Sequence, residues 1–60
     1  MWQVVYIARD KQSAEELQAK LQAEGVMANI RPLGNEGTSQ YEILVPESEL
    51  EEAHEVLTSV

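Results

Sequence analysis

Few side chains of this sequence could carry out chemistry, and they do not make up a complete site. His54 is the one histidine among 60 residues, and the chain has no cysteine. On a helix, Glu51 would lie one turn from His54, so the pair could offer two ligands to a metal ion. Structural zinc takes four protein ligands and catalytic zinc three, and no nucleophile–base pair or phosphate-binding loop accompanies these residues. We therefore expect no enzyme and no metal or cofactor site, and keep His54 as a candidate contact for a ligand or a partner.

Charged residues near the ends of two predicted strands are further candidates for such contacts. Arg9 and Asp10 follow the first predicted strand, and Arg31 lies near the end of the second. Guanidinium groups bind carboxylates and phosphates strongly, whereas surface ion pairing or simple solvation is the alternative. An acidic run near the end of the chain could face a basic partner, although such runs are usually solvated. Its members are Glu47, Glu49, Glu51, Glu52 and Glu55.

The charge balance restricts the classes of partner. With 11 acidic and 4 basic residues, the chain has a net charge of -7, which repels nucleic acid and anionic membrane surfaces. An RNA-recognition domain also carries aromatic residues on its first and third strands, as Trp2, Tyr6 and Tyr41 would be here, but the charge and the missing ribonucleoprotein motif argue against it. No leader pattern opens the sequence, and no apolar run could span a bilayer. Since the lack of cysteine fits a reducing compartment, we expect a soluble, cytoplasmic protein without nucleic-acid or membrane partners.

Periodicity and capping signals predict a strand and a helix in the first half of the chain. Residues 2–8 are rich in β-branched and aromatic types, which favours a strand. The helix that follows could be capped by Asp10 or by Ser13, whose SAEE stretch has the spacing of a capping box. Gly25 is placed to end this helix in a left-handed conformation. The predicted apolar face of the helix consists of Ala14, Leu17 and Leu21.

Two strands and a second helix are predicted in the second half. Alternation favours strands over 26–31 and 40–45, and the glycines and asparagine at 33–39 favour a hairpin loop between them. Pro46 suits the first turn of a helix, because its missing N–H costs nothing there. We expect that helix to run to about Leu57, with an acidic outer face. Its predicted apolar stripe consists of Leu50, Ala53 and Leu57.

The order strand, helix, strand, strand, helix predicts one α+β domain over 1–60. A right-handed crossover puts both helices on one face of a three-stranded, antiparallel-type sheet with strand order 1-3-2. This is a truncated ferredoxin-like unit (βαββα) that lacks the last strand of the full fold. The first strand is therefore expected to have an unpaired edge, and one face of the sheet to have no helix.

The first strand is apolar on both faces, so something should cover it. Strict alternation places Val5 and Ile7 on one face. The candidate interface residues lie on the other face, on the first and last strands: Trp2, Val4, Tyr6 and Leu44. A core of this size seldom supplies more than about 3–5 kcal/mol, and association is a common supplement. We therefore expect a homodimer that uses either the strand edge or the helix-free face.

Four stretches of the sequence resemble a family of small bacterial signal-transducing proteins. They are MWxVVYIA at the start, AEEL…L…EG at the end of the first helix, IRPxG after the second strand, and YEILVPESELEEAHEVL near the end. The resemblance covers nearly the whole chain. It implies a reduced version of the PII-type fold, which is ferredoxin-like and binds small effectors between subunits.

Two functions follow as expectations. The first is a non-enzymatic regulatory or interaction module that works as a homodimer, in signal transduction as the resemblance implies, and binds a protein partner or a small effector. The alternative is a sensing domain for an amino acid or a nucleotide. It would be similar to the amino-acid-binding regulatory domains, which have the same order of strands and helices.

Overall fold

The computed structural model describes residues 1–34 and 39–59. In chain order its elements are β1 (Trp2–Ala8), α1 (Lys11–Ala23), β2 (Asn29–Pro32), β3 (Tyr41–Pro46), the 3-10 helix η1 (Glu47–Glu49) and α2 (Leu50–Thr58). All the predicted strands and helices are present, although several of their ends differ. The tip of the predicted hairpin loop, at 35–38, lies outside the described residues.

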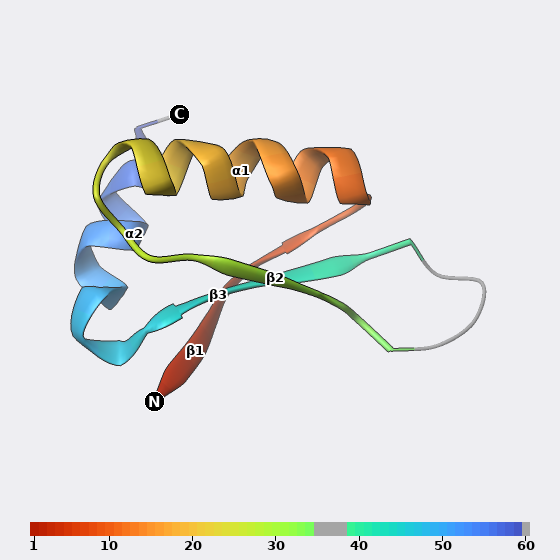
Figure 1. Cartoon of the computed structure of the whole chain (residues 1–60), viewed down its shortest axis with the longest axis horizontal. Coiled ribbons are helices and arrows are strands. Elements are labelled where there is room, and N and C mark those ends of the chain that lie inside the picture. Colours follow the sequence, from red (N-terminus) through yellow and green to blue (C-terminus); the bar gives the residue numbers. More distant parts are fainter. Residues whose placement is uncertain (35–38, 60) are drawn as a thin grey trace.

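The three strands form one antiparallel sheet in the order β1-β3-β2, so β3 is the central strand. Ile43 of β3 lies opposite Tyr6 of β1 on one side and Ile30 of β2 on the other. Figure 1 shows α1 running along the sheet and α2 at the end where β3 leaves it. The predicted α+β fold and strand order are confirmed. The ferredoxin-like description fits only loosely, because three strands form the sheet in the described part of the chain.

Both helices pack on the same face of the sheet. The core on that side draws on both helices, the central strand β3 and the segment before β2: Leu21, Val26, Ala28, Ile43, Val45, Ala53 and Val56. The predicted apolar stripe of the second helix omits Val56, which is only 9% exposed and lies three residues after Ala53 on the same side of α2. Leu50 and Leu57, which the stripe includes, are partly buried against this core. We call the opposite side of the sheet the helix-free face.

Local signals set both ends of α1. The N–H of Ser13 donates to the Asp10 carboxylate at 2.8 Å, which makes Asp10 the N-cap. The alternative cap at Ser13 is wrong, because the helix begins before this residue and Ser13 lies in its first turn. At the other end Gly25 has φ +84°, and the N–H of Val26 donates to the Leu21 carbonyl at 2.9 Å. This is the Schellman arrangement expected around a glycine.

The second strand begins later than its alternation predicts. β2 starts at Asn29, because side chains bind the backbone of the residues before it. The N–H of Met27 donates to Glu49 Oε1 at 2.8 Å, and the carbonyl of Ala28 accepts from Gln18 Nε2 at 2.9 Å. These contacts connect α1 and η1 to the start of β2.

Pro46 ends β3 and does not open the last helix. It lies opposite Trp2 in the sheet, and its φ of -62° and ψ of 147° are extended. The N–H of Glu47 still donates to the Met1 carbonyl, at 2.8 Å, so pairing with the start of the chain continues past Pro46. The prediction that Pro46 forms the first turn of the helix is therefore wrong.

Candidate functional site

A β-bulge in the middle of β1 changes the face that each side chain occupies. Val4 lies opposite Leu44, whereas Tyr6 lies opposite Ile43, so Val5 is an extra residue in this strand. Residues directly opposite each other in an antiparallel pair share a face, and Ile43 belongs to the core. Tyr6 therefore lies on the helix-covered side. The predicted alternation, which puts Tyr6 on the same face as Val4, is wrong because of the extra residue.

After the bulge, the alternation continues in the opposite sense. Ile7 lies opposite Glu42 and therefore on the helix-free face, whereas strict alternation places it with Val5. Ala8, the next residue, is buried at 1% exposure. The bulge thus moves one large apolar side chain to each face of the sheet.

Large apolar side chains of β1 are exposed on both faces. Trp2, Val4 and Ile7 are 41%, 44% and 41% exposed on the helix-free face, and Tyr6 is 48% exposed on the other. We call these four residues the β1 surface. Leu44, the remaining candidate interface residue, is only 9% exposed, since it belongs to the central strand.

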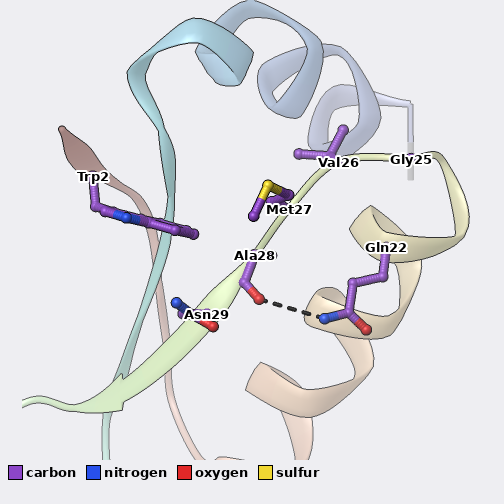
Figure 2. Close-up of a pocket in the computed structure, with 7 residues that line it drawn as sticks. All are labelled: Trp2, Gln22, Gly25, Val26, Met27, Ala28 and Asn29. Atoms are coloured by element: carbon purple, nitrogen blue, oxygen red, sulfur yellow. Dashed lines mark hydrogen bonds between the residues drawn. The ribbon is translucent and has the colours of Figure 1, made fainter.

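Trp2 separates two shallow hollows at one end of the sheet. Its indole lies across β3 and points towards Met27 and Asn29 (Figure 2). These residues contribute to a hollow of about 450 Å³ that reaches the end of α1. A second hollow, of about 410 Å³, is lined by Trp2, Asn29, Arg31 and Leu44 among others, on the helix-free side. Both hollows are mainly apolar; amide side chains contribute to the lining of each, and the Arg31 guanidinium contributes to the one on the helix-free side.

Arg31, one of the candidate contact residues, is paired within the sheet. Its Nη2 lies 2.8 Å from Glu42 Oε1, and its Nε donates to the same oxygen at 2.9 Å. The two residues lie directly opposite each other in β2 and β3. Because the Arg31 side chain is 62% exposed, this cross-strand pair contributes little to stability.

Arg9 and Asp10 lie where β1 passes into α1. Their side chains form a long ion pair, with Arg9 Nε 3.9 Å from Asp10 Oδ2. The backbone N–H of Ser13, and then its hydroxyl, hold the pKa of Asp10 below its ordinary value. The main contact of Asp10 is thus with the helix that it caps. Arg9 extends into solvent, its side chain 88% exposed.

The candidate contact residues do not come together in one site. His54 is exposed on α2, which lies at the opposite end of the molecule from the start of α1, where Arg9 and Asp10 lie (Figure 1). Within residues 1–34 and 39–59, no group of three or more acidic, histidine or cysteine side chains could hold a metal ion. In the same residues, no helix is both long enough and apolar enough to cross a membrane.

The acidic run is divided between solvent and one structural contact. Glu47, Glu51, Glu52 and Glu55 are exposed, as the prediction of an acidic outer face requires. Glu49 instead accepts the N–H of a residue that precedes β2. The sequence carries no signal for this contact, because its two partners are 22 residues apart.

Comparison of the chain with family models, with curated proteins and with solved structures found no match.

Proposed function

We propose that this chain is a non-enzymatic regulatory or interaction module that acts as a homodimer in the cytoplasm, in signal transduction. The observation that carries the proposal is the β1 surface, in which one strand of seven residues exposes four large apolar side chains by more than two fifths each. Apolar patches of this kind on a small domain mark interaction sites.

The size of the chain supports self-association. Among the described residues, ten form the buried apolar core, and four of these are alanines, so the apolar area that folding removes from water is small. Each Å² of apolar surface that a second copy covered would add about 25 cal/mol. Since the chain has no cysteine, disulfides cannot supply this stability. Association is therefore the means of stabilisation that remains for a domain of this size.

The mass of the protein in solution tests this proposal. Light scattering of the purified chain at tens of micromolar should give twice the monomer mass of 6.7 kDa. Dilution should return the monomer mass, because the dimer is held by mass action. A monomer mass at every concentration would refute the homodimer and remove the main support for an interaction module.

A sensor of small molecules is the second candidate, and the hollows on either side of Trp2 favour it. An indole, the amide of Asn29 and the guanidinium of Arg31 lie around the hollow on the helix-free side. Such groups suit a small ligand with a flat apolar part and a carboxylate or phosphate. An amino acid or a nucleotide would meet this description.

Trp2 provides the assay for this second candidate, because it is the one tryptophan of the chain. Titration with amino acids and nucleotides should change its fluorescence and raise the melting temperature. Asn29→Ala should weaken the response, whereas Glu52→Ala, an exposed change on α2, should leave it unaltered. A flat response to both ligand classes would rule out this candidate.

A further inference from the structure

We infer that β1 pairs antiparallel with β1 of a second copy, so that two sheets join edge to edge as one six-stranded sheet. This inference rests on the proposed homodimer and assigns its contact surface. It selects the free edge of β1 over the helix-free face.

The two edges of the sheet are protected to different degrees. β2 is four residues long and contains Arg31 and Pro32; short length, charge and proline all discourage pairing at an edge. β1 is seven residues long, WQVVYIA, with neither a charged residue nor a proline. Its one irregularity is the bulge at Val5. β1 is therefore the edge at which a further strand meets least resistance.

The distribution of exposed side chains also favours the edge. A dimer formed through the helix-free face would cover Trp2, Val4 and Ile7. It would leave Tyr6 uncovered, because the bulge turns this residue to the helix-covered side. A strand laid along β1 would contact side chains on both faces, so it accounts for Val4, Tyr6 and Ile7, whereas the Trp2 indole lies across β3 and away from this edge.

The backbone of β1 has hydrogen-bonding groups that point away from β3. The bond from the Glu47 N–H to the Met1 carbonyl identifies a hydrogen-bonded pair, and such pairs alternate along an antiparallel ladder. Counting residue by residue along β3 from the pair of Met1 and Glu47, the pairs that include Trp2, Val4 and Ile7 are non-hydrogen-bonded pairs. The N–H and C=O groups of these three residues therefore face the outer edge, where a second strand could bind them.

One symmetric register uses these groups in both copies. A two-fold axis between Val5 and Tyr6 would place Val4 of each copy opposite Ile7 of the other. In each chain Val5 and Tyr6 separate Val4 from Ile7. The bulge of one strand would therefore lie opposite the bulge of the other, and the extra residue in each strand would not shift the register. Such an isologous contact is the usual form of a two-fold dimer.

The helix side of the edge has room for this contact. A hollow of about 520 Å³ lies between β1 and α1, and Tyr6, Glu16, Leu17 and Lys20 contribute to its lining. The proposed axis would bring the tyrosines of the two copies together over it. Glu16 and Lys20 are one turn apart on α1. In an antiparallel arrangement, Glu16 of each copy could therefore lie near Lys20 of the other. These contacts would offset part of the repulsion between two chains of net charge -7.

A matched pair of lysine variants tests the inference. Tyr6→Lys and Met27→Lys make the same change in charge at side chains that are 48% and 57% exposed, so circular dichroism should show both folded. Tyr6 lies at the β1 edge, whereas Met27 lies beside β2. In sedimentation equilibrium, Tyr6→Lys should weaken the dimer at least about tenfold, and Met27→Lys by less than about twofold. Ile7→Lys, at the same edge but on the helix-free face, should act like Tyr6→Lys. If Tyr6→Lys does not fold, Tyr6→Thr, which removes the ring and keeps a residue that favours strands, replaces it.

The outcomes separate the edge contact from the homodimer itself. Loss of the dimer in both β1 variants, with the Met27→Lys dimer retained, would support the edge. A dimer that resists Tyr6→Lys but is lost in Ile7→Lys would overturn the inference in favour of the helix-free face and leave the homodimer intact. A wild-type chain that is monomeric at all concentrations would overturn both.

Discussion

Gly25 is the residue at which the backbone makes the strictest demand on the sequence. Its φ of +84° lies in the left-handed region, and a Cβ placed there would meet no atom within 4 Å. A side chain at this position would therefore destabilise the protein through backbone strain and not through a steric clash. We expect Gly25→Ala to lower the free energy of unfolding by about 1 kcal/mol in urea denaturation.

Asparagine supplies the control for this glycine. Because asparagine tolerates the left-handed region better than alanine, Gly25→Asn should destabilise the protein less than Gly25→Ala. Equal stability of Gly25→Ala and wild type would show that residue 25 does not adopt the left-handed conformation in solution.

Asp10 should make the stability of the fold depend on pH. Its folded-state pKa is lowered, first by the backbone N–H of Ser13, so its contribution is present above the unfolded-state pKa and is lost as pH falls through the folded one. Asparagine also caps helices but does not titrate. The stability advantage of wild type over Asp10→Asn should therefore shrink below about pH 4. Thermal melts of both proteins between neutral and acidic pH measure this, and an advantage that does not vary with pH would contradict the assignment.

A side-chain hydrogen bond connects η1 to the start of β2. Glu49 accepts the Met27 N–H at 2.8 Å. We expect Glu49→Ala to lower the free energy of unfolding by about 1 kcal/mol and to speed hydrogen exchange of the Met27 amide. Glu49→Gln retains an acceptor oxygen and should preserve most of the protection.

Glu47, two residues earlier and exposed, is the matched control. Glu47→Ala removes the same charge from η1 without removing this bond. If Glu47→Ala and Glu49→Ala have equal effects, charge rather than the hydrogen bond explains the loss.

Local signals predicted the elements well, whereas contacts between elements limited the prediction. The cap of α1 and its end at Gly25 depend on neighbours within five residues; the sequence predicts the end at Gly25 and narrows the cap to Asp10 or Ser13. The bulge at Val5 depends on how β1 meets β3, and the late start of β2 depends on a carboxylate 22 residues away. The strand order was predictable because a right-handed crossover leaves few alternatives. The faces of Tyr6 and Ile7 were not, because each depends on one extra residue.

The exposed apolar side chains of β1 and the exposed glutamates lie on different elements of the molecule. Among the described residues, the exposed glutamates lie on α1, at its C-cap, on η1 and on α2, and four of the six exposed large apolar residues lie on β1. The acidic surface repels polyanions, while the uncharged edge of β1 remains open to a strand. In the proposed dimer, this separation would keep most of the negative charge of the two copies solvated while they associate through β1. A candidate interface on the first strand was predictable from its composition, but the choice of the edge required the register of the sheet.

Amide hydrogen exchange at the edge of β1 tests this account most directly. In the dimer, the N–H groups of Val4 and Ile7 would be bonded to a second copy, so their exchange should slow as the protein concentration rises. The amide of Ile30, which alternation along β3 places at the outer edge of β2, should exchange at a rate that concentration does not change. Equally fast exchange of Val4 and Ile7 at low and high concentration would contradict the pairing of β1 with a second copy.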